Sequence, residues 1–494
     1  MNIFVFFLIL LCSVSPVRAA DDSLFLSFDK VLEYALAANP DIQEAKFAWQ
    51  SKSFGTAAQY GEFEPKLSGR AFKERAERPG ALFVETKDEY KLGIQGKLPI
   101  GTSYDVGFNQ ATYTHSDITS ELYLGAELKQ SLLKDGPLYS GATNLLRQAK
   151  FEQQKLYQDY RQTLTDILEK ICDAYWNYFY AFQVVKFSTE AVKVSEEIYK
   201  DAVHRVNEGL IAPLEFARAK NEWMLRQSAL LDAQNSLRLE KMQLLLMIPV
   251  PELLKDSLTI VINPQLEDIK TMDLDSTATQ DTICQLHPLY LSQSAILSYH
   301  ETVLELHKNQ RLPSLNIVGS YGFRSRDDKA RAAIDKFKKN ELRQRVLAGG
   351  VEFELPLWAN KHHRAMAKAS EANLRSAKIR LDLIAQQLLE EHRIISAQFH
   401  EVFTQWEIGK ATVDFYQIEL QDELTKIRLG KSSYHDVFEI EDNLRESKKR
   451  EIKLARMAQI IKIQWQKSTG SLLLSYDYEQ LSPDGLLLHQ KLRE

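Results

Sequence analysis

A stretch late in the chain carries the side chains best placed to act on an ion. Residues 428–442 read RLGKSSYHDVFEIED, with four acids within 12 residues after Gly430. The four are Asp436, Glu439, Glu441 and Asp442. Asp436 and Glu439 are three residues apart, which places both carboxylates on one face of a helix. Such a pair can repel anions or bind a cation, but it can also simply complement a helix dipole.

The same stretch has the composition of a turn between two helices. It interrupts 126 residues without proline, from Leu357 to Ser482. Gly430 can adopt the left-handed conformation that ends a helix. Ser432 or Ser433 can cap the next helix, and Asp436 follows Ser433 at the spacing of a capping box. These residue types explain a chain reversal before any function is assumed.

Little else in the sequence suggests chemistry. We find no glycine-rich phosphate loop, no clustered metal ligands and no nucleophile constellation, so we expect no enzyme activity and no cofactor. The pair His362-His363 is a weak metal candidate because adjacent helix residues do not share a face. A net charge of −5 without a basic cluster argues against nucleic-acid binding.

The N-terminus predicts export from the cytoplasm. Residues 1–19 contain a short apolar core and a small-residue cleavage site, typical of a signal peptide. An uncleaved anchor, or a lipid on Cys12, is the alternative. Cys172 and Cys284 would then remain; one bridge between them is possible but is not predicted. After residue 20 no apolar stretch long enough for a transmembrane helix follows.

The second half of the chain echoes the first. Pro40 and Pro65 are 25 residues apart, as are Pro288 and Pro313, and the two pairs are related by an offset of 248. Further along, residues 208–223 align with the stretch around 428–442 at an offset of 221, so that Gly209 falls on Gly430. A repeat this long is not a solenoid unit and indicates a duplicated half-molecule.

Each half has the same expected plan of helix, strands and long helical hairpin. Alternating apolar residues predict strands at 89–98, 121–128 and 347–355. Residues 101–108 are a further candidate, and residues 65–72 and 313–323 are the expected opening strands of the two halves. Apolar residues spaced three and four apart then predict long helices with coiled-coil-like packing. Examples are Leu164, Ile167, Ile171, Ala174, Tyr178, Ala181 and Val185.

These strands are too few to close a barrel within one chain, since about eight is the small limit. Strands with an apolar and a polar face suit a transmembrane barrel, whose edges must be paired in lipid. Several copies should therefore share one barrel. Three copies would supply 12 strands, or 18 if the candidates at 89–98 and 101–108 also span.

The order of these features resembles the TolC-like outer membrane efflux proteins. The resemblance rests on LSFDKVLEYALAANPDIQEA (26–45), on LELHKNQRLPSLNIVGSY (304–321), on VEFELPLWANKHHRAMAKASEANLRSA (351–377) and on the two glycine turns. It covers nearly the whole mature chain. The sequence departs from the family at residues 78–120, which are longer than in most members. That extra hairpin either joins the barrel or forms an extracellular flap.

The resemblance implies a homotrimer in which an outer membrane β-barrel continues into a periplasmic α-helical barrel. Such a duct passively conducts substrates from an inner-membrane pump, of the RND, ABC or MFS class, through a periplasmic adaptor. It serves tripartite efflux or type I secretion. The alternative is a periplasmic coiled-coil scaffold without channel activity. Neither the substrate nor the pump class is readable from the sequence.

The resemblance also assigns candidate site residues. Asp436 and Glu439 match the acids at the periplasmic constriction of the family. The tips that meet the adaptor correspond to Gly209, Leu210, Ile211, Gly430 and Lys431. The basic residue usual two positions after the second glycine is Ser432 here, which leaves open how the gate is held closed.

The expected domain boundaries follow from the repeat. Residues 20–248 form the first half, with strands within 65–132 and a helical turn at 209–213. Residues 249–285 form a linker. Residues 286–470 form the second half, with a β-hairpin at 313–357 and a turn at 430–433, and 471–494 form a tail.

Overall fold

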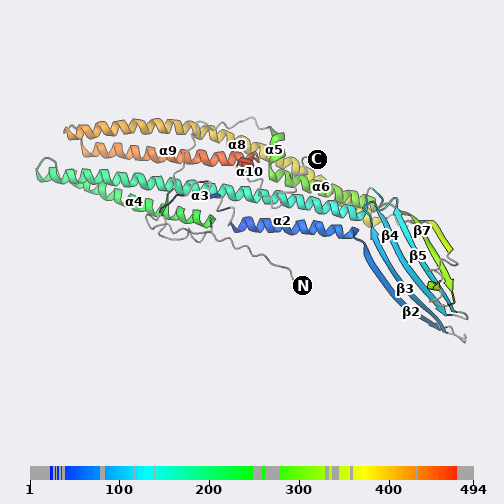
Figure 1. The fold of residues 1–494 in the computed structure, drawn as a ribbon. Helices are drawn as coiled ribbons and strands as arrows, with labels where there is room; N and C mark the ends of the chain where they lie inside the picture. Colours follow the sequence, from blue (N-terminus) through cyan, green and yellow to red (C-terminus); the bar gives the residue numbers. More distant parts are fainter. Residues whose placement is uncertain are drawn as a thin grey trace, which may run out of the picture. The chain divides into compact units, whose positions relative to one another are not determined.

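The fold was analysed in a computed structural model of the chain (Figure 1). The described residues are 23–25, 28, 31–32, 35, 39–77, 84–114, 118–137, 139–248, 259–261, 279–328, 333–335, 344–355, 360–429 and 431–475. The predicted signal peptide with Cys12, most of the predicted linker, residues 476–494 of the predicted tail and Gly430 lie outside them.

The elements follow the same order in both halves of the chain. The first half contains α2 (Pro40–Gln59), the short helix η1 (Tyr60–Phe63), β2 (Lys66–Glu77), β3 (Val84–Lys97), β4 (Thr102–Thr114), β5 (Ile118–Ser131), α3 (Gly141–Asn207) and α4 (Pro213–Met247). The second contains α5 (Gln280–Leu286), α6 (Pro288–Asn309), β7 (Ser314–Asp327), β8 (Gln344–Glu354), α8 (Lys361–Arg428), α9 (Tyr434–Ser468) and α10 (Leu472–Ser475). The predicted fold class, mainly helical with a β part and two related halves, is confirmed.

The chain divides into two compact units. The first comprises residues 1–40, 166–275 and 395–465, and it includes all of α4 and nearly all of α9. It also holds a two-stranded parallel sheet, in which β1 (Ser23–Phe25) pairs with β6 (Thr259–Val261). The second comprises residues 41–165, 276–394 and 466–494 and contains the large sheet.

The long helices form where the sequence repeats apolar residues every three or four positions. Of the seven α3 positions identified from this spacing, all but Val185 are buried. Helices α3 and α8 have 67 and 68 residues. At 1.5 Å per residue each is about 100 Å long. None of the helices in the described ranges combines the length and the apolar character needed to cross a membrane.

The second unit holds a six-stranded antiparallel sheet in the order β2-β3-β4-β5-β7-β8. The strands are longer than the alternating segments that predicted them, because pairing continues beyond the strictly alternating residues. Strands β3 and β4, the extra pair of the first half, lie between β2 and β5 and are hydrogen-bonded on both sides. The extra hairpin is therefore part of the sheet and does not project from it as a flap.

Related residues end the sheet in both halves. Asp135, after β5, and Asn360, after β8, are the two non-glycine residues of the described chain with positive φ, at 57° and 47°. They are 225 residues apart, the offset that also aligns Gly125 and Glu127 of the first half with Gly350 and Glu352 of the second. Aspartate and asparagine tolerate this left-handed conformation better than other side chains. Each therefore turns the chain from a strand towards a long helix.

The end of α6 holds both of these junctions. The Asn309 side chain accepts a hydrogen bond from the Asp135 N–H (2.8 Å) and donates one to the Leu133 carbonyl (3.0 Å). Gln310 donates to the Asp135 carboxylate (2.9 Å), and its carbonyl accepts a bond from the Asn360 amide (3.0 Å). One helix end thus fixes the starting geometry of α3 and α8.

The turn between β3 and β4 is also anchored at the start of α3. Ser140 and Thr143 both donate side-chain hydrogen bonds to the Pro99 carbonyl, at 3.0 and 2.8 Å. Gly101 has a φ of 76°, and a Cβ atom there would lie 2.3 Å from the Asp135 carbonyl oxygen. The contact requires glycine, and it ties the extra hairpin to the same junction.

Cys172 and Cys284 are both free thiols in the structure. Cys172 lies within α3 in the first unit and is buried, whereas Cys284 lies in α5 of the second unit. The bridge that the sequence left possible is not formed.

Replacing Asn309 should destabilise the junction. Asn309→Leu leaves the Asp135 N–H without this partner, in a site where Asn309 is 6% exposed, whereas the Leu133 carbonyl keeps a bond from the Gly136 N–H at 3.3 Å. One lost partner costs about 1–3 kcal/mol, so we expect a loss of that size. The midpoint of denaturation in detergent measures it. Lys308→Ala, an exposed neighbour, is the control and should leave that midpoint unchanged; an equal shift in both variants would contradict the role assigned to Asn309.

Candidate functional site

The turn between α3 and α4 ends one helix and begins the next within five residues. Gly209 has a φ of 75°, the left-handed conformation that terminates many helices. The Leu210 N–H then donates to the Arg205 carbonyl at 2.8 Å, which satisfies one of the last carbonyls of α3. Pro213 occupies the first position of α4, where its missing N–H carries no penalty.

The turn between α8 and α9 repeats this backbone arrangement. The Lys431 N–H donates to the Lys426 carbonyl at 2.9 Å, and both residues lie 221 positions after their counterparts in the first turn. Gly430, placed by the sequence at the centre of this turn, lies outside the described residues.

Ser433 and Asp436 form the capping box that their spacing indicates. The Asp436 N–H donates to the Ser433 hydroxyl oxygen at 3.3 Å. In return the Asp436 carboxylate accepts bonds from the Ser433 N–H (3.2 Å) and hydroxyl (2.8 Å). These bonds, first among them the one from the hydroxyl, lower the pKa of Asp436. The carboxylate is therefore ionised at neutral pH and begins α9 as an N-terminal acid.

Asp436 and Glu439 are both exposed on α9. They lie one turn apart on the same side of the helix, because residues three apart are neighbours on a helix surface. The capping box accounts for Asp436 within a single chain. Among the residues that the structure describes, no such contact accounts for Glu439.

The two turns pack against each other through a shared apolar core in the first unit. The core comprises Ile198, Ala202, Ala219, Ile427, Tyr434, Val437 and Phe438, contributed by α3, α4, α8 and α9. At its edge the Tyr434 hydroxyl donates to the Asp201 carboxylate at 2.5 Å, and Arg205 pairs with the same carboxylate at 2.9 Å. Burial and the bond to Asp201 raise the pKa of Tyr434, so the phenol stays protonated.

Ser432, the departure from the family pattern, has polar partners within its own chain. Its hydroxyl donates to Glu423 of α8 and, at 3.3 Å, to Asp436. Glu423 also accepts a bond from Lys426 at 2.8 Å. Hydrogen bonds from Lys426 and Ser432 lower the pKa of Glu423. A serine here thus bridges two carboxylates across the turn.

Three leucines are exposed at the two turns. Leu210, Leu214 and Leu429 are 68%, 61% and 65% exposed. Ile211, predicted as part of the same surface, is partly buried and packs against the apolar core. Leu429 was not predicted, and its counterpart in the first turn at the 221-residue offset is Glu208.

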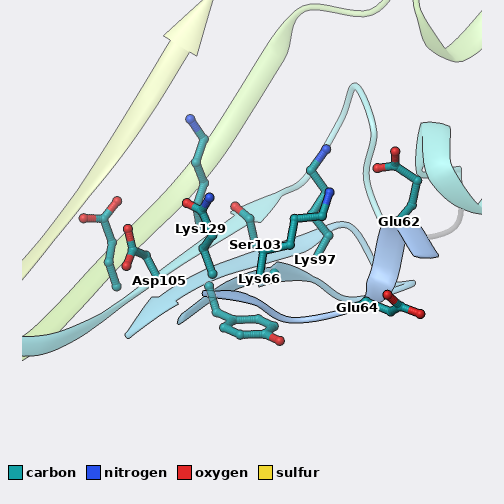
Figure 2. Close-up of a pocket in the computed structure, with 11 residues that line it drawn as sticks. Glu62, Glu64, Lys66, Lys97, Ser103, Asp105 and Lys129 are labelled. Carbon is teal, nitrogen blue, oxygen red and sulfur yellow. The ribbon is translucent and has the colours of Figure 1, made fainter. Parts of the chain in front are cut away.

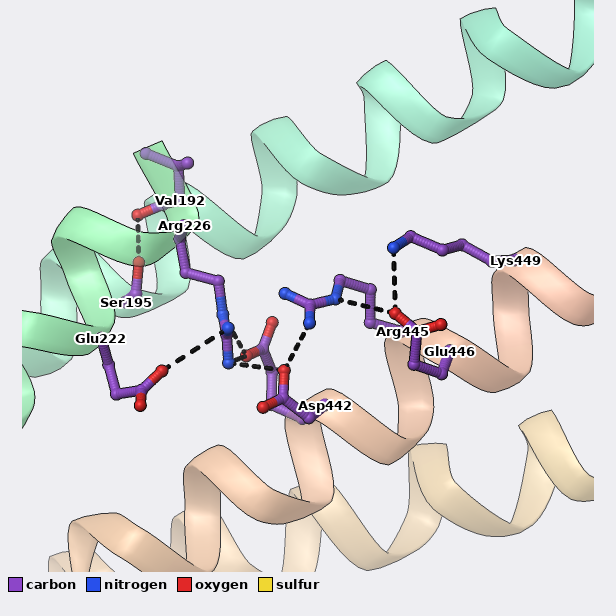
Figure 3. Close-up of polar contacts among 9 residues, drawn as sticks. Val192, Ser195, Glu222, Arg226, Asp442, Arg445, Glu446 and Lys449 are labelled. Carbon is purple, nitrogen blue, oxygen red and sulfur yellow. Dashed lines mark hydrogen bonds and ion pairs between the residues drawn. The ribbon is translucent and has the colours of Figure 1, made fainter. Parts of the chain in front are cut away.

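A buried ionic cluster joins α4 to α9 beside these turns (Figure 3). Arg226 is 6% exposed and contacts Glu441 at 3.0 Å and Asp442 at 2.7 Å. Glu222 lies 3.5 Å from Arg226, and Arg445 contacts Asp442 at 2.6 Å. Burial raises the pKa of Glu441, and the attraction of Arg226 and Arg445 opposes that rise. The cluster fixes α9, and with it Asp436 and Glu439, against the first hairpin.

Sequence reasoning identified Glu441 and Asp442 as part of an acidic run but did not assign them a partner. The partner lies more than two hundred residues away, and which arginine faces them depends on how α4 and α9 are aligned lengthwise. No local pattern carries that information.

The sheet in the second unit has one polar face, lined by ion pairs between strands. Lys91 of β3 contacts Asp105 of β4 at 2.7 Å, and Lys129 of β5 contacts Glu352 of β8 at 2.5 Å. A hollow of about 350 Å³ opens on this face next to η1. Figure 2 shows Lys66, Lys97 and Lys129 in this hollow, with Glu62 and Glu64 on its other side.

Among the described residues no group of three His, Cys, Asp or Glu side chains is arranged to hold a metal ion.

Residues 101–248, from the turn before β4 to the end of α4, match the outer membrane efflux protein family. No curated protein matches the chain by sequence. The family match thus covers strands, the long helical hairpin and the first glycine turn together.

Solved structures match the fold of nearly the whole chain. The Campylobacter jejuni CmeC outer membrane channel is 16% identical with a TM-score of 0.63, and the match covers 94% of this chain and 90% of that one. The Vibrio cholerae outer membrane protein VceC is 13% identical (TM-score 0.59), covering 90% and 95%. The open state of the Neisseria gonorrhoeae MtrE outer membrane channel is 13% identical (TM-score 0.59), covering 90% and 89%.

Removing Arg226 should destabilise the first unit in a pH-dependent way. Arg226→Met leaves Glu441 buried without its partner, which costs about 3–5 kcal/mol. Because the pKa of Glu441 is already raised in the folded state, the folded state holds the proton more tightly, and stability rises as pH falls. The variant raises that pKa further, so its defect should shrink as the pH is lowered from about 8 to about 5.

Thermal unfolding measured across this pH range tests the expectation. Glu222→Gln is the matched control, since it removes only the 3.5 Å contact at the edge of the cluster and should cost less than about 1 kcal/mol. A defect of Arg226→Met that does not change with pH would exclude Glu441 as its cause.

Proposed function

We propose that this chain, a relative of the outer membrane efflux proteins, is the outer membrane exit duct of a tripartite efflux or type I secretion system. The observation that carries the proposal is a six-stranded sheet in which every strand bears at least one exposed large apolar side chain on the same face. One row across the sheet consists of Leu67, Ile94, Val106, Ala126, Tyr321 and Leu347. Five of these six are 48–83% exposed.

An exposed apolar band of this kind suits contact with lipid. In water it would be a large aggregation-prone surface, which disfavours a soluble scaffold. The opposite face, with its paired lysines and carboxylates, suits a water-filled lumen.

The duct is a homotrimer in this proposal. In the described chain β2 and β8 are the sheet edges, and neither has a further strand beside it. Unpaired backbone groups are not tolerated in lipid, so the edges must pair with other copies. The helices also expose large apolar side chains that copies would cover. They are Met224, Leu231, Leu239 and Leu246 of α4 and Ile379, Ile394, Ile408, Phe415 and Ile418 of α8.

The barrel lies in the outer membrane and the helices extend into the periplasm. The exposed leucines of the two turns, with Gly209, Gly430 and Lys431, form the surface that meets a periplasmic adaptor, which in turn joins an inner-membrane pump. The duct conducts passively, catalyses no reaction and needs no cofactor.

Asp436 and Glu439 form the constriction of the closed duct. Each chain contributes two exposed carboxylates, so a trimer brings six around its axis. Carboxylates in such a ring repel anions and attract divalent cations. The capping box holds Asp436 in a fixed orientation, and the ionic cluster of Arg226 holds the helix that carries both acids.

Channel activity tests the proposed function as a whole. The protein should fractionate with outer membranes, require detergent for extraction and form ion-conducting channels in planar bilayers. A protein found in the soluble periplasmic fraction would favour the scaffold alternative and would rule out the duct.

Neutralising the two acids should weaken cation block at the constriction. Asp436→Asn with Glu439→Gln removes six negative charges from a trimer, so we expect higher conductance and at least a tenfold loss of divalent-cation affinity, about 1.4 kcal/mol. Single-channel recording with added divalent cations measures both.

Ser433→Ala is the matched control for the gate variant. It removes the cap of α9, at a cost of about 1 kcal/mol in stability, but keeps both carboxylates. Block by divalent cations should therefore persist in Ser433→Ala. Equal loss of block in both variants would assign the effect to the helix cap, and unchanged block in the double variant would remove these acids from the constriction.

A further inference from the structure

The extra hairpin of the first half, β3 and β4, has the pairing and the two faces expected of strands in a barrel. Its strands β3 and β4 pair with each other and with β2 and β5 along nearly their full lengths. Lys91 and Asp105 join the two strands across the polar face, and Ile94 and Val106 lie side by side on the apolar face. The hairpin therefore has the same two faces as the rest of the sheet.

A row of glycines crosses the sheet and includes both strands of this hairpin. Gly93, Gly107, Gly125 and Gly322 are register partners on β3, β4, β5 and β7. They alternate with the apolar row, so they lie on the polar face. A Cβ atom on Gly107 would lie 2.9 Å from Gly93 Cα, and one on Gly322 would lie 2.7 Å from the Leu124 carbonyl oxygen.

Neighbouring backbones thus approach too closely on the polar face for any side chain. This crowding is what a sheet shows where it curves with that face on the inside, and aligned glycines are a device for such curvature. The ring of Tyr123 lies over Gly125 and Gly322, within 2.7 Å of the position of a Cβ atom on either, and covers the bend. The extra hairpin has its glycines in the same row as β5 and β7. All four strands can therefore curve together as one continuous sheet.

We infer that each chain contributes all six strands to the shared barrel, which gives the trimer an eighteen-stranded pore wide enough for an extended or helical polypeptide. The inference rests on the proposed trimeric duct and adds the size class of its cargo. Of the two totals that the sequence allowed for a trimer, 12 and 18 strands, the inference selects 18.

The width follows from the strand number. Strands about 4.8 Å apart, tilted about 40°, give eighteen strands a backbone diameter of about 36 Å and twelve strands about 24 Å. Side chains occupy about 5 Å on each side, half of the spacing between packed sheets. The lumen is then about 26 Å wide with the hairpin and about 14 Å without it.

A lumen of this width sets a definite limit on cargo. An α-helix with its side chains is about 10–12 Å across, so one helix fits a lumen of either width, whereas two helices side by side fit only the wider one. A folded domain of 100 residues has a radius of gyration of about 13 Å, so its full diameter exceeds the opening. The outer membrane end therefore admits unfolded or helical chains as well as small molecules, and excludes folded domains.

Polymer exclusion in planar bilayers measures the width directly. Neutral polyethylene glycols of graded size, added on the barrel side, lower the conductance only when they enter the lumen. Polymers up to about 26 Å in diameter should enter the full-length channel. A limit near 14 Å would overturn the inference while leaving the duct intact, whereas absence of any channel would reject the proposed function instead.

A deletion variant adds a second measure where it folds. Removing Val84–Thr114 takes out both strands of the hairpin and leaves the chain on the correct side of the sheet to continue into β5. The largest polymer that enters should then shrink by nearly half. An unchanged limit in a trimeric deletion variant would show that the hairpin is not part of the wall.

Crosslinking identifies the strands that meet between copies without any deletion. In a background of Cys172→Ser and Cys284→Ser, we would place one cysteine on β2 (Ser68→Cys) and one on β8 (Ala348→Cys). A short bifunctional maleimide should give covalent trimers with this pair. The control pairs Ala348→Cys with Asn109→Cys on β4 and should give monomers; covalent trimers from the control alone would place the hairpin outside the ring.

Discussion

Backbone groups at the edge of a sheet must find hydrogen-bond partners, and lipid offers none. This requirement governs the rest of the molecule. Six strands leave two open edges, β2 and β8, so in the proposed duct the sheet is completed by a ring of copies. Copies in that ring would also meet along their helices, which would cover the large exposed apolar side chains of α4 and α8.

The periodic features of the fold were predictable because each depends on the types and spacing of a few neighbouring residues. Alternation identified β3, β5 and β8, the repeated motifs of the two halves placed β2 and β7, and β4 was a further candidate. The spacing of apolar residues identified α3 and α8. The duplication explained why equivalent turns occur in both halves, and the 221-residue offset places Lys431 and Leu210 in the same backbone hydrogen bond. The capping role of Ser433 also followed from its distance to Asp436.

Features that depend on alignment between distant segments were not predictable. Arg226 contacts Glu441 and Asp442 only because α4 and α9 are aligned lengthwise in one particular register. The glycine row emerges only when the register of four strands is known, since in sequence its members are scattered single glycines. The same holds for Asp135 and Asn360, whose left-handed conformations depend on the polar groups at the end of α6. Whether Asp436 and Glu439 face a common axis is a property of an assembly, which a single chain does not encode locally.

The extra hairpin has a consequence for how such a channel can change in size. A hairpin returns the chain to the side of the sheet from which it departed, so α3 begins at the same anchored junction whether the first half has two strands or four. One added strand would instead leave the chain at the opposite rim, with no route back to its helix. The circumference of the proposed barrel can therefore grow only by two strands per subunit at a time. In a symmetric trimer each such addition is made three times. Pore width in this architecture is set by the number of hairpins per subunit. It can therefore change in large increments while the sequence of the helical parts stays the same.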